Sequence, residues 1–519
     1  MTAVRTRAYF CRVKFQRSGG LLLHCTSLPG PFGIGDLGPQ AREFADFLHA
    51  GGLKLWQVLP LHPTGYGDSP YQCFSAFAGS PLLLSLDAMR DRGLLTGADL
   101  ANPPEFPLDT VDYEAAARFK MPLLVRAAEC FFADASGDDR AAFERFREGA
   151  EWLEDFALFM ALKEAHRGVA WTHWELALRD RDPRALAEFA RSRETQLQTI
   201  RFWQFEFSRQ WRELRNWCEA RSIRLMGDIP IYVAHDSADV WARPDLFQLN
   251  ALGQPTAVSG VPPDYFSATG QLWGNPIYRW ERIEEDGFAW WIARFRSALA
   301  LFDLVRLDHF RGFEAYWEVP GTETTAINGR WVHAPGQALL SALEKEFGEL
   351  PIVAENLGVI TPPVERLRHR FNLPGMSILQ FAFGTDSQAP TFRPHNYTRD
   401  LVAYTGSHDN DTAQGWWTSS GGADSTRSPE DVRKEHDFAR AYLNISDETQ
   451  IHWAMIRAVF SSIADTVIVP VQDVLGLGNA ARMNLPGTVS GNWKWRCRSG
   501  VLDAALATRL RELANLYER

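Results

Sequence analysis

The sequence predicts a (β/α)8 barrel, because eight apolar, strand-like runs alternate with helical segments along its 519 residues. Two long stretches interrupt this alternation, a helical one after the second run and a Gly/Pro-rich one after the third. Charged residues also stand where several runs end, and barrels place their chemistry at those strand ends. The alternative is an open doubly wound sheet. A nucleotide-binding sheet of that kind would carry a Gly-rich phosphate loop, and the sequence contains neither GxGxxG nor GxxxxGK[ST].

Composition narrows the class of protein. Hydrophobic residues make up 45% and charged residues 23% of the chain, which is typical of a globular protein in water. The net charge of −10 argues against a nucleic-acid or anionic-membrane partner, and no apolar run is as long as a membrane-spanning helix. The six cysteines form no CxxC pair, so neither a zinc site nor a disulfide framework is expected. A cytoplasmic location therefore fits.

The first 81 residues begin the barrel. Residues 1–19 form a basic lead-in that we expect to be flexible; its basic character could indicate a transit peptide, but the apolar run LLLHC follows closely and no signal-peptide core precedes it. Residues 20–81 then hold a strand at Leu21–Cys25, a helix at Pro39–Ala50 and a strand at Leu53–Leu61. This strand, helix and strand order predicts a parallel βαβ unit.

A long loop, His62–Pro81, follows the second strand and contains Tyr66 and Tyr71. Loops at the carboxyl ends of strands often bind ligands, although this one could also be only an irregular connection. The chain is rich in aromatic residues, with 33 Phe, 19 Trp and 12 Tyr. They indicate either a large core or stacking surfaces for flat ligands such as sugar rings.

Two insertions are expected. Residues 82–215 are rich in Ala, Arg, Glu and Leu and predict a mainly helical subdomain whose tryptophans belong to its core. Residues 216–235 return to a strand pattern that contains Asp228. Residues 236–285 form a second insertion, with a long Gly/Pro-rich loop that we expect to lack secondary structure and to act as a lid. The aromatic residues of this lid are Tyr265, Phe266 and Trp273.

Residues 286–519 should contain barrel strands four to eight and the C-terminal helices. The expected strand-like runs are those of VRLDHFRGF, Leu350–Gly358, Met376–Phe383, Leu401–Asp411 and Thr466–Gly478. Helices are expected at Phe288–Phe302, Gly336–Phe347 and Asp447–Ile463.

Acidic residues at three strand ends are the candidate catalytic groups. Asp308 follows an apolar run, and Arg306, two residues earlier on the same face, would hold it ionised as a nucleophile requires. A structural salt bridge at the strand end is the alternative. Glu355 ends an apolar run, where burial would keep it protonated as an acid, and Asp409 could stabilise a charge-separated transition state beside His408.

Grouped carboxylates without a metal motif suggest glycosidic chemistry, with carboxyl groups about 5–5.5 Å apart in a retaining enzyme. A magnesium or zinc site is the competing interpretation, but the histidines form neither His-x-His nor HExxH. We therefore expect no metal and no cofactor.

The order of Asp228, Arg306-x-Asp308, Glu355 and His408-Asp409 resembles the α-amylase superfamily. Longer strings are similar to the amylomaltases, which are 4-α-glucanotransferases or disproportionating enzymes: GYGDSPYQ, GDIPIYV, GNPIY, RLDHFRGF, AENLG, SHDND and RMNLPGT…NWKWR. The resemblance runs from about Leu21 to the end of the chain and implies retaining transfer of α-1,4-glucan segments on a (β/α)8 barrel. It also implies that the chain has no C-terminal β-sandwich domain like that of the amylases.

The resemblance also implies roles for single residues. Asp308 is then the nucleophile, Glu355 the general acid/base and Asp409 the transition-state stabiliser. The implied binding residues are Arg306, His408, Asp228, Tyr71 beneath the sugar at the cleavage point, the lid residues Tyr265, Phe266 and Trp273, a secondary glucan-binding Tyr66, and Ser69, His309 and Asn356 within the matching strings. The partners expected are donor and acceptor α-glucans, and the chain should be a monomer or a weak homo-oligomer.

Two alternatives remain at this point. A hydrolase of the same superfamily would use the same acids, because transfer differs only in that a sugar hydroxyl must outcompete water. A non-catalytic glucan-binding protein on the same barrel would show no turnover.

Overall fold

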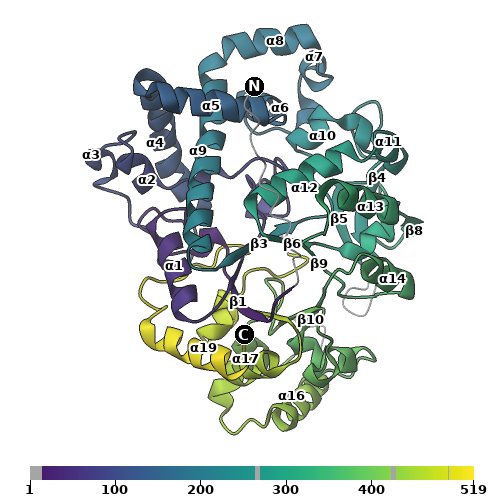
Figure 1. Cartoon of the computed structure of the whole chain (residues 1–519). Helices are drawn as coiled ribbons and strands as arrows, with labels where there is room; N and C mark the ends of the chain where they lie inside the picture. Colours follow the sequence, from purple (N-terminus) through teal and green to yellow (C-terminus); the bar gives the residue numbers. More distant parts are fainter. Residues whose placement is uncertain (1–14, 264–268, 422–427, 489) are drawn as a thin grey trace.

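In the computed structural model, residues 15–263, 269–421, 428–488 and 490–519 are described. Eight parallel strands form the expected barrel, in the hydrogen-bonded order β10-β11-β12-β1-β2-β3-β6-β9 (Figure 1). The gap between β9 and β10 is bridged by the Ala354 N–H, which donates to the Pro374 carbonyl at 2.8 Å. The strands are β1 (Ser18–Leu22), β2 (Leu55–Gln57), β3 (Arg224–Ile229), β6 (Leu304–Leu307), β9 (Ile352–Ala354), β10 (Gly375–Ile378), β11 (Leu401–Tyr404) and β12 (Thr466–Pro470).

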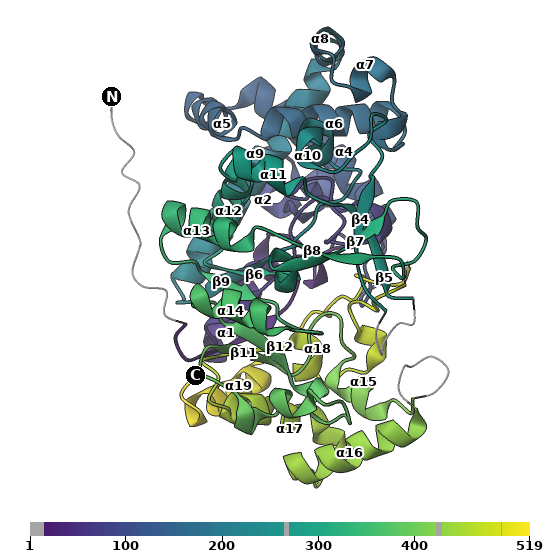
Figure 2. The same ribbon diagram turned by 90° about the vertical axis from the view of Figure 1, so that its right-hand side faces the viewer.

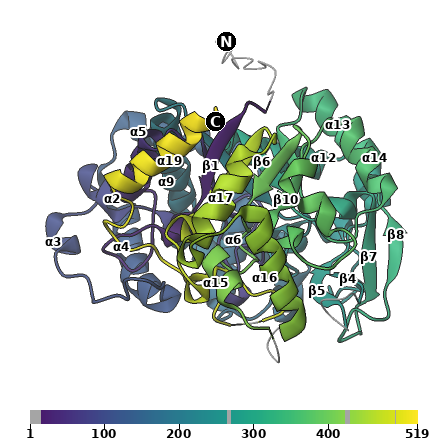
Figure 3. The same cartoon turned by 90° about the horizontal axis from the view of Figure 1, so that it is seen from below.

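Helices surround the barrel, and those near the C-terminus cover its underside (Figure 3). They are α1 (Pro39–Ala50), α12 (Ala289–Leu301), α13 (Gly336–Phe347), α14 (Pro362–Arg370), α16 (Pro429–Leu443), α17 (Ile451–Ser461) and α19 (Ala504–Leu516). Helix α1 has the bounds that its sequence predicts. Pro39 occupies its first turn, its apolar residues at helical spacing are buried, and Gly51 follows its end.

The stretch after β2 is helical, as the sequence predicts, and stands at one end of the molecule in Figures 1 and 2. Its helices are α2 (Leu86–Asp91), α3 (Gly97–Leu100), α4 (Tyr113–Asp134), α5 (Gly137–Gly149), α6 (Leu153–Ala165), α7 (Leu176–Arg179), α8 (Pro183–Ser192) and α9 (Glu194–Glu219). The last helix passes the expected boundary at residue 215 and packs on α1, α12 and β3. It therefore also serves as a helix of the barrel.

The lid insertion differs from the expectation. Residues 236–285 contain α10 (Ala238–Ala242), β4 (Ala257–Val261), β5 (Gln271–Pro276) and α11 (Trp280–Glu285), so the prediction of a loop without secondary structure is wrong. Strand β4 pairs antiparallel with β5 and with β7 (Ala315–Pro320), which in turn pairs with β8 (Arg330–His333). This four-stranded sheet beside the barrel is visible in Figure 2 and was not expected. Its pairing is non-local, since β7 and β8 belong to the segment after β6.

The first strand also begins earlier than expected. β1 starts at Ser18, so the last two residues of the predicted lead-in belong to the barrel, and residues 1–14 of that lead-in lie outside the described part of the chain. The SGG start hides the strand because glycine has low strand propensity. Gly20 is nevertheless required, since a Cβ there would lie 2.4 Å from the Cβ of Leu55 on β2.

Two short helices, α15 (Ala413–Thr418) and α18 (Val471–Val474), follow β11 and β12. No helix within the described ranges is both long enough and apolar enough to cross a bilayer.

Candidate active site

The candidate acids stand at or beyond the carboxyl ends of barrel strands, on the same side of the barrel. Asp308 directly follows β6 and Glu355 directly follows β9, while Asp409 lies in the loop after β11. Backbone hydrogen bonds join the first two strand ends: the Glu355 N–H donates to the Leu307 carbonyl, and the Phe310 N–H donates to the Glu355 carbonyl, both at 3.1 Å. The topology thus brings carboxyl groups from distant parts of the sequence to one mouth of the barrel.

Arg306 links two acids on adjacent strands. Its guanidinium contacts a carboxylate oxygen of Asp228 at 2.7 Å and one of Asp308 at 2.7 Å. Arg306 and Asp228 are 5% and 2% exposed, whereas the side chain of Asp308 is 27% exposed. Burial raises the pKa of Asp228, an effect that Arg306 opposes. The cluster therefore has one carboxylate that is partly exposed to solvent and one that is buried.

Glu355 is held by backbone donors. Its two carboxyl oxygens accept hydrogen bonds from the N–H groups of His309 and Leu357, both at 2.8 Å. Burial nevertheless raises the pKa of Glu355 to about 7, with Asp308 adding to the shift and Arg306 opposing it. A carboxyl group with this pKa can both donate and accept a proton near neutral pH.

The turn at His309 explains how the donor to Glu355 is placed. His309 has φ 49° and ψ 50°, a left-handed conformation that is uncommon for residues other than glycine. It turns the chain after Asp308 into the short 3-10 helix Phe310–Phe313 and directs its N–H at Glu355. Burial lowers the pKa of the His309 imidazole to about 4, so this ring is neutral. Such backbone strain is concentrated at functional sites.

The aromatic residues of the site stack on one another. Tyr71 donates a hydrogen bond to Asp228 at 2.9 Å, and its ring lies 5.2 Å from that of His408 with an interplanar angle of 16°. Trp493 adds a third ring, 5.7 Å from Tyr71 and 5.8 Å from His408. Together these rings form an aromatic cluster beside Asp228, in which Trp493 is tilted by 42° against Tyr71 and by 38° against His408. Trp493 received no role from the sequence, although it lies in the NWKWR string.

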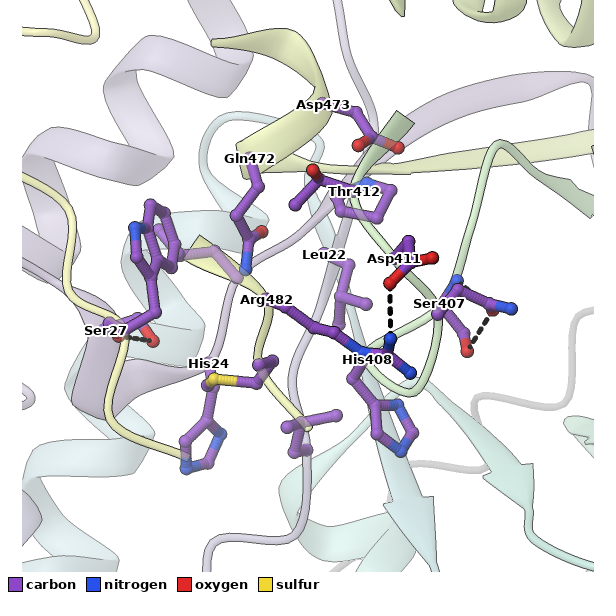
Figure 4. Close-up of a pocket in the computed structure, with 16 residues that line it drawn as sticks. Leu22, His24, Ser27, Ser407, His408, Asp411, Thr412, Gln472, Asp473 and Arg482 are labelled. Carbon is purple, nitrogen blue, oxygen red and sulfur yellow. Dashed lines mark hydrogen bonds and ion pairs between the residues drawn. The ribbon is translucent and has the colours of Figure 1, made fainter. Parts of the chain in front are cut away.

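Asp409 is contacted from the C-terminal part of the chain. Asn484 donates to a carboxylate oxygen of Asp409 at 2.6 Å, and His408 lies 3.4 Å from the other oxygen. The Asp409 side chain is 43% exposed, so its carboxylate remains accessible to solvent. Asn484 is a second residue that sequence reasoning missed; the RMNLPGT string carries it, but nothing local indicates its contact with Asp409. His408 also lines a cavity between its loop and the segment after β12, together with Asp411 and Arg482 (Figure 4).

The remaining predicted binding residues differ in their placement. Trp273 lies in β5 with its ring edge-on to that of His309 at 4.8 Å, and the Ser69 hydroxyl accepts a hydrogen bond from the Tyr71 N–H at 3.2 Å. Tyr66 is 76% exposed at the surface. The Asn356 amide is engaged on both sides, donating to Glu365 and accepting from the Met376 N–H, both at 2.8 Å. Tyr265 and Phe266 lie outside the described residues.

Within the described ranges, no group of three or more His, Cys, Asp or Glu side chains is arranged to hold a metal ion. The five cysteines of these ranges, Cys25, Cys73, Cys130, Cys218 and Cys497, are free.

The chain is similar in sequence and in structure to known 4-alpha-glucanotransferases. A family model described as 4-alpha-glucanotransferase matches residues 23–502. A 4-alpha-glucanotransferase of Thermus thermophilus is 50% identical over 98% of this chain and 100% of its own length, and a chloroplastic/amyloplastic one of Solanum tuberosum is 44% identical over 97% and 87%. The solved structure of an amylomaltase from Streptococcus agalactiae in complex with acarbose is similar with a TM-score of 0.91 and 37% identity, over 97% of this chain and 100% of that one.

Proposed function

The chain belongs to the 4-alpha-glucanotransferase family, and from this premise we propose that it transfers α-1,4-glucan segments with retention, through a covalent glycosyl ester on Asp308. The donor is a maltooligosaccharide or longer α-glucan, and the acceptor is the 4-hydroxyl of glucose or of a second glucan. The observation that carries this proposal is the pair of neighbouring acids with different surroundings. Asp308 is paired with Arg306, whereas the pKa of Glu355 is raised to about 7.

In the first step, Asp308 attacks the anomeric carbon while protonated Glu355 donates its proton to the departing glucan oxygen. Arg306 keeps the attacking oxygen of Asp308 oriented through its 2.7 Å contact. In the second step, Glu355 removes a proton from the acceptor hydroxyl, which attacks the ester and releases Asp308. Atoms and charge balance, because the proton that Glu355 gives in the first step returns in the second.

The surrounding residues hold the sugar at the cleavage point. The rings of Tyr71 and His408 supply an apolar face for the flat side of a pyranose. The partly exposed carboxylate of Asp409 lies beside His408, where it can bind sugar hydroxyls and stabilise the oxocarbenium-like transition state. The Tyr71 hydroxyl also donates a hydrogen bond to Asp228, which accepts a second one from Arg306.

Transfer requires that water be kept from the ester. Trp273 on β5 contacts His309, the residue next to the nucleophile, so the antiparallel sheet meets the barrel close to the reacting centre. We infer that this contact, together with the predicted lid residues Tyr265 and Phe266, favours a sugar acceptor over water. The free cysteines support a reducing, cytoplasmic location.

The test is incubation of the purified protein with maltotriose, without added metal, followed by chromatography of the products. A ladder of longer maltooligosaccharides together with glucose is expected. Glucose and maltose without longer products would instead establish a hydrolase and would contradict the role given to Trp273. An unchanged substrate would refute both activities and leave a glucan-binding protein.

A further inference from the structure

The loop that carries His408 and Asp409 is held mainly by a segment that follows it by about seventy residues in sequence. This loop, residues 405–412, joins β11 to α15, which begins at Ala413. One buried carboxylate fastens both of its ends: Asp473 on α18, which is 1% exposed, accepts hydrogen bonds from the Thr405 hydroxyl at 2.5 Å and from the Ala413 N–H at 2.6 Å. The middle of the loop is held separately.

Arg482 reaches into the middle of the loop with a single guanidinium group. Its three nitrogens donate to three acceptors: the Asn484 carbonyl at 2.7 Å, the Asp409 carbonyl at 2.6 Å, and the carboxylate of Asp411. Figure 4 shows the side chain extending toward Asp411 and His408. The side chains of Arg482 and Asp411 are 19% and 18% exposed, so the ion pair is largely shielded from solvent. A planar fork of this kind fixes geometry that a point charge does not.

Asn484 completes the contact with both residues of the site. Its backbone N–H donates to the His408 carbonyl at 3.0 Å, and its side-chain amide donates to the Asp409 carboxylate at 2.6 Å. Since Arg482 also binds the carbonyl of Asn484, it acts on Asp409 by two routes, through the Asp409 backbone and through the residue that orients the Asp409 carboxylate.

We propose that Arg482 is a positioning residue that fixes the Asp409 carboxylate for the transition state, by joining the loop 405–412 to the segment that carries Asn484. The inference rests on the proposed function, in which Asp409 stabilises the transition state. It assigns Arg482 no contact with substrate. Its loss should therefore reduce kcat far more than it raises KM, because a displacement of about 1 Å in a stabilising group costs about a hundredfold in rate.

The experiment uses Arg482→Lys, which keeps the charge beside Asp411 but cannot reach three acceptors at once. Arg215→Lys is the matched control, because the Arg215 guanidinium also joins a carbonyl (Ala300, 2.7 Å) to a carboxylate (Asp303, 2.7 Å), at the opposite end of the barrel. We expect similar melting temperatures for the two variants. The kcat of maltotriose transfer should fall about a hundredfold only in Arg482→Lys, and its KM should change less than about threefold.

A double-mutant cycle with Asp409→Asn separates positioning from general stability. If Arg482 acts through Asp409, Arg482→Lys should cause little further loss of kcat in the Asp409→Asn background. An equal loss in both backgrounds, or an Arg482→Lys enzyme as active as Arg215→Lys, would overturn the proposal. Should Arg482→Lys not fold, Asp411→Asn removes the charge of the pair and must lower kcat in the same way. An inactive wild-type protein would instead refute the proposed function, before any variant is compared.

Discussion

Two groups of oppositely charged side chains in this molecule differ in composition and in burial: the Lys120–Asp36 pair and the cluster of Arg306, Asp228 and Asp308. Lys120 on α4 contacts Asp36 at 3.2 Å and the Leu82 carbonyl at 2.7 Å, and its side chain is fully buried. Asp36 also accepts from the Gly38 N–H at 3.0 Å, so this pair is balanced and sealed. In the site, Arg306 serves two carboxylates, and Asp308 remains 27% exposed.

The comparison shows what distinguishes a reactive cluster from a structural one. Burial of a matched pair satisfies both charges, and breaking such a pair is costly to stability. A cluster with one cation and two acids leaves a partly exposed carboxylate that is available for chemistry. Substitutions in the site should therefore lower turnover with little effect on the free energy of unfolding. Substitutions in the Lys120–Asp36 pair should lower the free energy of unfolding with little effect on turnover.

The largest expected effect on turnover is that of Asp308→Asn. The amide has nearly the shape of the carboxylate but cannot form the ester, so kcat for maltotriose should fall at least about a thousandfold. The unfolding midpoint in urea should stay close to that of the wild type. Retention of near-wild-type turnover would mean that the Arg306–Asp308 contact is a strand-end salt bridge.

Arg306→Lys should have the next largest effect. Lysine keeps the positive charge but cannot contact Asp228 and Asp308 together, since these contacts use two nitrogens of a planar group. We expect a loss of about a hundredfold in kcat/KM, measured as initial rates of glucose release. A lysine variant with unchanged rates would show that charge alone, without the fork geometry, is sufficient.

The pH dependence of kcat/KM tests the role of Glu355. With its pKa raised to about 7, the group is protonated below that pH and loses its proton above it. Because the first step needs the protonated acid, kcat/KM should fall about tenfold for each pH unit above the pKa. Glu355→Gln should lose most of its activity, and what remains should lack this alkaline limb. If kcat/KM of Glu355→Gln fell at high pH in the same way as that of the wild type, the titrating group would be another residue.

Local patterns in the sequence were enough to predict the barrel and the position of the acids at the ends of its strands. Buried strands such as β12 are continuous apolar runs, and helices α1 and α13 begin and end at the residues that their periodicity predicts. The charged residue after such a run is visible without any structure, as at Asp308. These features depend on near neighbours in the chain.

Features that depend on distant residues were not predictable. β4 pairs with β7, and Asn484 reaches Asp409, across segments that no local pattern connects. Asn356 is a different case: it stands next to Glu355 and is expected to bind substrate, while its amide joins Glu365 and Met376 in this structure. Substrate binding by Asn356 stays a prediction, and these contacts favour a role in fastening β9 to β10.

A substitution in the buried Lys120–Asp36 pair should have the smallest effect on turnover. Lys120→Met removes the cation and leaves the Asp36 carboxylate buried without a partner charge, which should lower the free energy of unfolding by about 3–5 kcal/mol. The kcat of the folded protein should not change, because Lys120 lies outside the site. Adding Asp36→Asn should recover part of the lost stability, since the buried charge is then gone. Urea unfolding and initial rates on the same samples measure both quantities, and a loss of kcat in folded Lys120→Met would show that the two clusters are coupled.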